Sequence, residues 1–269
     1  MLSGAAIALL LSGVVAGRQV DNGTLLAKLL GRDVIERHQA LDTIRRTDPD
    51  EVGSELRGAL ISLLAQAGEA QAQRYRAARA GEELTVQEDP ELLLKLIPIV
   101  AALRDPRSIE ALTAGLGMAA AAREALAALG EQAIPALVAL LETPDSRRGA
   151  VNDALVTLRF IVEESDTMPL SENAYASIVN LCESRLATSV DPLGNGRLLR
   201  TTIDLAVAVD VQRLRRIVEL LATDANAVAE RGVRPEWVAE TQRHAADRLA
   251  GIPPQIQREG LNSVLERSR

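Results

Sequence analysis

The sequence predicts an all-α fold of stacked helix pairs, an α-α superhelix, and three observations support this. Apolar residues recur three and four positions apart along most of the 269 residues, a spacing that puts them on one face of a helix. Aromatic residues make up 1% of the chain, which argues against sandwiches and barrels because strands favour aromatic and β-branched residues. Finally, one apolar pattern occurs twice in tandem near the middle of the chain.

The first 17 residues are typical of an export signal or an amino-terminal anchor. Met1 to Gly17 carries no charge, and Arg18 is the first charged residue. An apolar run of about 16 residues is short for a membrane-spanning helix, which needs roughly 20 residues, and suits a secretory signal cleaved after Ala16 or Gly17. We therefore expect a periplasmic or extracellular protein. An uncleaved membrane anchor and a buried first helix of a cytoplasmic protein are the alternatives.

The tandem pattern lies between Asp105 and Glu163. The apolar pair in Ile109–Leu112 recurs in Ile134–Leu137, 25 residues later. The motif Ala-Leu-x-x-Leu in Ala125–Leu129 recurs in Ala154–Leu158, 29 residues later. Each copy therefore predicts two short helices, and neither can bury its apolar stripe without a stacked neighbour.

The difference between the two offsets means that the second copy has four extra residues, which we expect in its internal turn around Thr143–Ser146. A third copy is expected near the start, where Leu26–Leu30 resembles Leu137–Leu141 and Ala40–Ile44 resembles the second-helix motif.

Turn residues separate the expected helices. Asp105-Pro106 and Asp48-Pro49 each place a capping carboxylate before a proline in the first turn. Gly130 follows the end of one helix, and Asp145-Ser146 is expected to cap the helix that begins near Arg147.

The remaining elements are also expected to be helices joined by loops. A long helix should run from Ser54 into the stretch Gly68–Asp89 and end in an acidic loop at Glu82–Asp89, and a turn-rich loop should fill Leu186–Gly196. The helices expected after this loop are Leu198–Ala208, Gln212–Leu221 and Glu236–Leu249, followed by a short helical tail at Glu259–Arg269.

The stretch Ala121 to Glu142, AAREALAALGEQAIPALVALLE, resembles HEAT-like repeats of the short type first described in phycobilisome lyases. The resemblance extends over Asp105 to Glu163 and more weakly over Leu25 to Ala67. It implies an α-solenoid with a concave interaction face, and it implies no lyase activity because no residue set for bilin chemistry can be carried over. The expected divisions are residues 1–17 as signal or anchor, 18–186 as HEAT-like repeats and 187–269 as carboxy-terminal helical repeats or cap.

Candidate catalytic groups are sparse, and we expect no catalytic, cofactor or metal site. His38 and His244 each have an aspartate about one turn away but lack a third ligand. Cys182 lies in an apolar stripe, which is typical of a small buried residue. The adjacent carboxylates Glu82-Glu83 and Glu163-Glu164 do not face each other on a helix. No phosphate-binding or dinucleotide motif is present, and Gly194-Asn195-Gly196 is expected to form a turn.

Arginine clusters are the candidate protein-binding residues, because guanidinium groups make directed hydrogen bonds. Trp237, at an expected helix start, is interpreted as a packing residue rather than a binding residue. The net charge of −7 and the scarcity of aromatics argue against nucleic acid. The candidates are Arg147, Arg148, Arg197, Arg200, Arg213 and Arg216.

The sequence therefore favours a non-catalytic protein-binding scaffold exported to the cell envelope, with an unidentified protein partner. Two alternatives stay open. One is a ligand-binding or enzyme-like solenoid, either of lyase type or a DNA-alkylation glycosylase, which the acidic charge disfavours. The other is a passive structural element of the envelope.

Overall fold

The computed structural model describes residues 21–81, 89–143, 146–165, 167, 169–188 and 193–253. These residues form helices and no strands, which confirms the all-α prediction. None of the described helices combines the length and the apolar composition needed to cross a bilayer. The helices are α1 (Asn22–Leu30), α2 (Val34–Ile44), α3 (Ser54–Ala80), α4 (Pro90–Leu103), α5 (Ile109–Ala114), α6 (Ala120–Ala128), α7 (Ile134–Glu142), α8 (Arg148–Glu163), α9 (Glu172–Ala187), α10 (Arg197–Val209), α11 (Gln212–Thr223), α12 (Ala225–Ala229) and α13 (Pro235–Leu249).

The chain divides into two compact units, residues 1–59 and 60–269, with the division inside α3. In the described part of the first unit, α1 and α2 pack as a helical hairpin. Leu29 of α1 and Leu41 of α2 are buried. Each helix starts at an aspartate that caps it: Asp21 accepts a hydrogen bond from the Thr24 N–H, and Asp33 accepts one from the Ile35 N–H.

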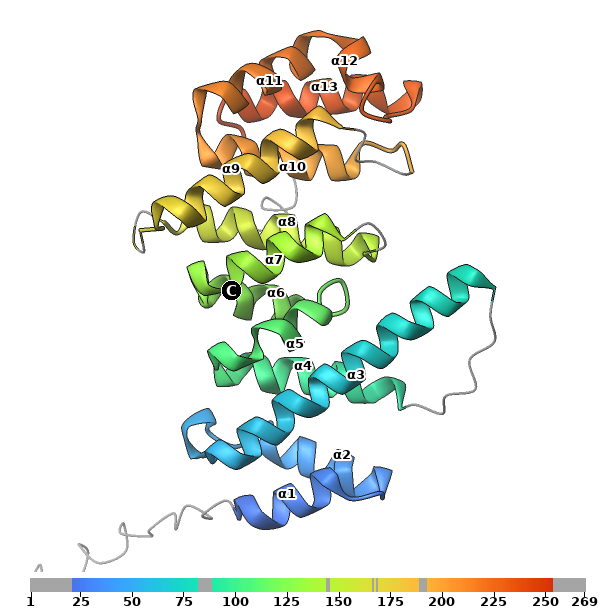
Figure 1. The fold of residues 1–269 in the computed structure, drawn as a ribbon, viewed down its shortest axis with the longest axis vertical. Coiled ribbons are helices and arrows are strands. Elements are labelled where there is room, and N and C mark those ends of the chain that lie inside the picture. Colours follow the sequence, from blue (N-terminus) through green and yellow to red (C-terminus); the bar gives the residue numbers. More distant parts are fainter. Residues whose placement is uncertain are drawn as a thin grey trace, which may run out of the picture. The chain divides into compact units, whose positions relative to one another are not determined.

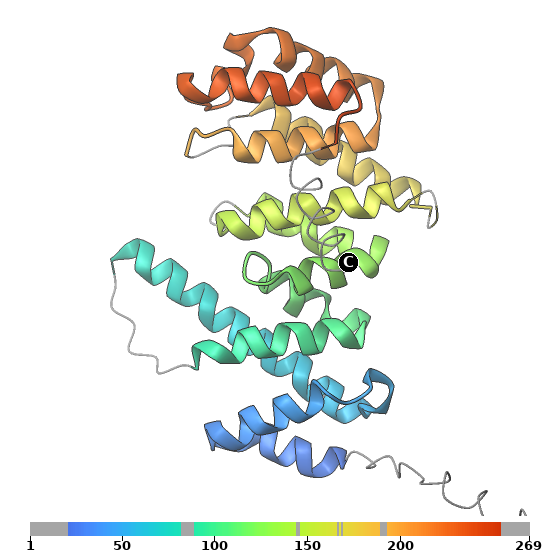
Figure 2. The same cartoon turned by 180° about the vertical axis from the view of Figure 1, so that it is seen from behind.

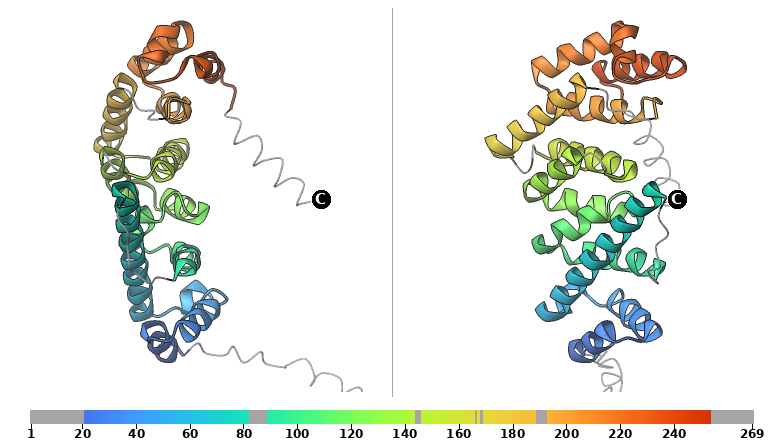
Figure 3. Two further views of the ribbon diagram at one scale, coloured as in Figure 1. Left: turned by 90° about the vertical axis from the view of Figure 1, so that its right-hand side faces the viewer. Right: turned by 45° about the vertical axis from the view of Figure 1, so that its right-hand side comes forward.

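In the second unit the helices pack in two layers. One layer contains α4, α6, α8, α10 and α13, each in contact with the next, and Figure 2 shows it toward the viewer. The other layer contains α5, α7, α9 and α11, which also contact one another in order and lie in front in Figure 1. Figure 3 shows the two layers edge-on in its left view. Helices of the two layers also contact each other within the pairs α5/α6, α7/α8 and α9/α10, which is consistent with a helical-repeat fold.

The tandem pattern corresponds to the helix pairs α5/α6 and α7/α8, and the third copy corresponds to α1/α2. The repeated positions form the core: Leu112 and Leu137 are fully buried in the first helices, and Leu126 and Leu155 in the second. The sequence assigned the helix pairs correctly because each apolar stripe is a local pattern with a helical period.

The position of the four extra residues was predicted wrongly. The turns at 115–119 and 143–147 are equally long, whereas α7 has 9 residues and α5 has 6. Three of the four extra residues therefore lengthen the first helix of the second copy, and the fourth lies in α8 before Ala154. Gly115 ends α5 early, while α7 continues through leucines that favour a helix.

The predicted caps are largely confirmed. The Asp105 carboxylate accepts a hydrogen bond from the Arg107 N–H at 3.0 Å, and Asp48 does the same for Asp50 at 2.9 Å. Gly130 has a φ of 60°, the left-handed conformation expected after a helix end. Ser146 does not cap α8: its hydroxyl donates to the Leu140 carbonyl of the preceding helix.

The carboxy-terminal predictions agree with α10, α11 and α13 to within two residues at each end. The turn at Gly194–Gly196 is confirmed, and both of its glycines have a positive φ. The long helix from Ser54 is confirmed as α3. The leader at 1–17, most of the acidic loop at 82–89, Asp145 and the tail at 259–269 lie outside the described residues.

Candidate functional site

A cavity of about 420 Å³ lies between α3 and α4 in the second unit, beside the α5–α6 turn. This volume falls in the range of about 300–1,000 Å³ that is usual for ligand pockets. Most of the residues that line the cavity are apolar, and the other four are polar or charged. The lining residues are Leu63, Gln66, Ala67, Ala70, Gln71, Arg74, Asp89, Leu92, Leu93, Leu94 and Met118.

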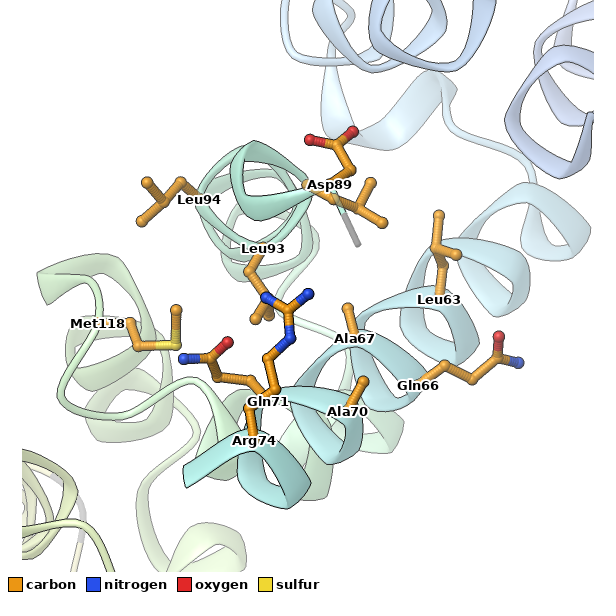
Figure 4. A pocket seen from close by; sticks show the side chains of 11 residues that line it. Leu63, Gln66, Ala67, Ala70, Gln71, Arg74, Asp89, Leu93, Leu94 and Met118 are labelled. Atoms are coloured by element: carbon orange, nitrogen blue, oxygen red, sulfur yellow. The ribbon is translucent and has the colours of Figure 1, made fainter. Parts of the chain in front are cut away.

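The cavity exists because α3 presents small side chains where α4 presents large ones. Ala67 and Ala70 are one turn apart on α3, and both are half-buried. Leu93 of α4 points toward them in Figure 4, and Met118 approaches from the side. Alanine methyl groups do not fill the space opposite a leucine, so a hollow with apolar walls remains.

Polar groups enter this hollow from α3 and from the start of α4. The Arg74 side chain extends from α3 toward α4, with Gln71 beside it (Figure 4). Asp89 caps α4 by accepting a hydrogen bond from the Glu91 N–H at 3.1 Å, which fixes its carboxylate at the edge of the hollow. An amide, a guanidinium and a carboxylate around apolar walls suit an apolar side chain next to polar or charged groups.

The arginines predicted to bind a partner lie on several helices. Arg147 is half-buried, and its guanidinium donates to the carbonyls of Ala114 and Leu116 at the end of α5. Burial lowers the pKa of Arg147. This side chain therefore satisfies carbonyl groups that the end of α5 leaves without a helical partner. Arg148 is half-buried at the first position of α8.

The other four candidates lie on α10 and α11. Arg200 pairs with Glu240 of α13 at 3.1 Å, and Arg213 forms an ion pair with Glu183 of α9. Arg197 and Arg216 are exposed. Three of the six guanidinium groups thus have a stabilising partner within the chain, and a role for any of the six in binding stays a prediction.

His244 belongs to a buried polar cluster that the sequence did not predict. Its Nε2 atom lies 2.9 Å from Oδ1 of Asp204, and Arg248 Nε lies 2.9 Å from the same oxygen. Arg159 Nη1 lies 3.7 Å from Oδ2. The cluster joins α8, α10 and α13. Two arginines and a histidine surround one carboxylate, which is a set of donors for an anion and not a set of metal ligands.

Other candidates for chemistry have structural surroundings. No group of three or more histidine, cysteine, aspartate or glutamate residues in the described ranges is placed to hold a metal ion. His38 lies half-buried on α2. Cys182 is fully buried, as predicted, and burial raises its pKa to about 12. Trp237 is 38% exposed and therefore only partly packed.

Sequence reasoning missed the hollow between α3 and α4. The signal available was the run of small and polar residues Ala67, Ala70 and Gln71 in the middle of α3, on the same helical face as Leu63 and Arg74. Such a run is equally typical of an exposed helix. It indicates a hollow only when the facing helix is known.

Comparison with known proteins gave no match to a family model, a curated protein or a solved structure. The resemblance to HEAT-like repeats therefore stays a prediction.

Proposed function

We propose that this protein is a non-catalytic scaffold of HEAT-like solenoid type, exported to the cell envelope, that binds another protein through the hollow between α3 and α4. The hollow is the observation on which this proposal depends. Its apolar walls suit one or two apolar side chains of a partner segment, and Gln71 and Arg74 suit polar groups of that segment.

The arrangement of the second unit supports binding rather than catalysis. Helical repeats provide long surfaces on which one partner makes many small contacts. The residues lining the hollow include no cysteine, serine, threonine or histidine, so they offer neither the usual nucleophile nor an imidazole base. The apolar leader at 1–17 supports export, where a partner would be an envelope or secreted protein.

Site-specific crosslinking in the native cell tests the proposal. A photo-crosslinking amino acid is placed at Gln66 or Gln71, which line the hollow, and in a second strain at Ala65. Ala65 is exposed and lies on the opposite side of α3, so it is the matched control. We expect one dominant adduct of defined mass from the positions in the hollow and none from Ala65.

A substitution that fills the hollow makes the test specific. Ala70→Trp places an indole in the cavity and should reduce the adduct at least about tenfold, because burial of a partner side chain is worth about 1.5–3 kcal/mol. Ala65→Trp should leave the adduct unchanged. Equal adducts from Gln71 and Ala65, or an adduct that survives Ala70→Trp, would show that the hollow is not the binding site.

A small apolar ligand is the second candidate occupant, favoured by the volume of about 420 Å³. Native mass spectrometry of the purified protein distinguishes the two. A bound species of a few hundred daltons that is lost in Ala70→Trp favours the ligand, whereas a protein adduct without such a species favours the scaffold.

A further inference from the structure

The turn between α1 and α2 carries three large apolar side chains in contact with solvent. Leu30 is 63% exposed, Val34 is 49% exposed and Ile35 is 69% exposed. They are the last residue of α1 and the first two residues of α2. Three such residues next to one another form a patch, and a patch of this kind is typical of an interaction surface.

The exposed face of α1 extends this patch. Gly23, Thr24, Ala27 and Leu30 are exposed and uncharged, and the one charged residue of the helix, Lys28, is half-buried. The exposed face of α1 therefore carries no charged side chain.

The turn is held in place by its own hydrogen bonds. Asp33 accepts hydrogen bonds from the N–H groups of Ile35 and Glu36 at 2.8 and 3.2 Å. The Arg37 guanidinium donates to the Leu29 carbonyl at 3.2 Å and to the Gly31 carbonyl at 2.7 Å. These bonds satisfy backbone groups that would otherwise need water, and they reduce the cost of moving the turn into an apolar environment.

We propose that the α1–α2 turn is a membrane-contact surface, in which Leu30, Val34 and Ile35 enter the interfacial region of a lipid bilayer. The uncharged segment Met1–Gly17 precedes α1 by four residues, so an apolar stretch that suits a membrane lies in the chain just before the helix that ends at Leu30. Exposed Arg32 and half-buried Lys28 flank the apolar side chains and suit lipid headgroups, and the exposed carboxylates of Asp33 and Glu36 balance their charge, so insertion of the turn depends on its apolar side chains. This inference is independent of the binding role of the α3–α4 hollow.

The test measures the depth of the turn in vesicles with the full-length chain. An environment-sensitive fluorophore is attached at Ile35→Cys, and in a control protein at Thr43→Cys, an exposed site near the other end of α2. The buried Cys182 thiol does not compete for the label at neutral pH. The vesicles contain phosphatidylcholine and phosphatidylglycerol, with or without brominated acyl chains that quench fluorophores in the bilayer.

We expect the label at residue 35 to be quenched at least about fivefold more than the label at residue 43, because interfacial insertion reaches only about 5–10 Å into the bilayer. Adding Leu30→Gln and Val34→Gln to the labelled protein should remove most of this quenching. Helix content by circular dichroism should not change, because both side chains are exposed in the folded protein.

Three results would overturn the proposal. One is equal or absent quenching at both sites while the chain is bound to vesicles. The second is quenching at residue 35 that survives the two glutamine substitutions. The third is a blue shift of the residue-35 label that grows with protein concentration in the absence of vesicles, which would assign the patch to contact between copies of the chain.

Discussion

At the scale of single residues, Asp204 shows how a buried charge is maintained in this fold. The residue is 7% exposed, and the two arginines that face it are Arg159, 4% exposed, and Arg248, whose side chain is 10% exposed. A buried carboxylate is tolerated only when cations and hydrogen bonds replace its water. Here α8 supplies one cation, and α13 supplies the other cation and His244. The three helices therefore depend on one another at this point.

Replacement of Asp204 by asparagine should strongly destabilise the protein. The variant Asp204→Asn leaves Arg248 buried without its anion and leaves Arg159 with only Glu163, whose Oε1 lies 3.5 Å from the Arg159 Nε atom. The loss of one partner of a buried ion pair costs about 3–5 kcal/mol. Urea unfolding at pH 7 measures this difference in the free energy of unfolding. The control is Asp210→Asn, at an exposed site with a φ of 51°, which asparagine adopts readily. A change of less than about 1 kcal/mol for Asp204→Asn would show that the cluster is not a stabilising charge network.

The Cys182 thiol should make the stability of the protein fall at high pH. Burial raises its pKa from 9.0 to about 12, so above pH 9 the unfolded chain loses the proton while the folded chain keeps it. Unfolding then becomes more favourable by up to about 1.4 kcal/mol per pH unit between pH 9 and pH 12, and below pH 9 there is no effect.

This prediction is measured by urea unfolding at pH 8 to 11 in the original chain and in Cys182→Ala. The difference between the two proteins isolates the thiol from all other titrating groups. The difference in the free energy of unfolding between the original chain and Cys182→Ala should become smaller as the pH rises. A difference that does not change with pH would contradict the raised pKa of Cys182.

At the scale of elements, the α5–α6 turn packs against the start of α8 through Gly117 of the turn and Gly149 of α8. Gly117 has a φ of 78°, and a Cβ on it would lie 2.6 Å from the backbone nitrogen of Ala150. The Gly117 N–H donates to Asp153 at 3.0 Å. The close approach of two backbones joins neighbouring repeats, and it requires a residue without a side chain at this position.

The variant Gly117→Ala should lower the free energy of unfolding by at least about 2 kcal/mol, from backbone strain and from the clash with α8. Thermal and urea unfolding measure the change. Gly58→Ala is the control, because a Cβ at Gly58 meets nothing within 4 Å. An alanine inside α3 should stabilise the helix by about 0.5–1 kcal/mol. Equal effects of the two substitutions would show that the turn does not require a glycine.

At the scale of the whole molecule, contacts are short-range along the chain. Within the second unit, the extensive contacts in the described residues join helices no more than three positions apart in order. Stability in such an array is approximately a sum of local terms, so a lesion in one helix should loosen its neighbours more than distant helices.

Hydrogen exchange measured by mass spectrometry tests this locality. The variant Ile203→Ala removes a fully buried side chain from α10. It should accelerate exchange in α8 to α11 and in α13, and it should leave α1 and α2 unchanged. Leu41→Ala, at a fully buried position of α2, is the reciprocal control and should affect α1 and α2 first. Uniform acceleration along the chain in either variant would indicate a single cooperative unit.

The sequence determined by itself what depends on neighbouring residues along the chain. The helical period gave the helix pairs α5/α6 and α7/α8, the Asp-Pro pairs gave the caps at Asp48 and Asp105, and an apolar stripe gave the burial of Cys182. Each of these features is stabilised within one or two helical turns.

Only the tertiary structure decided which side chains from distant segments meet. It placed alanines of α3 opposite Leu93, brought His244 and Arg248 to Asp204 from 40 or more residues away, and left Leu30 and Ile35 exposed. A hollow, a charge cluster and an exposed patch depend on packing between helices. An apolar stripe predicts that a helix face is covered, and packing alone determines which residues cover it and which positions stay open.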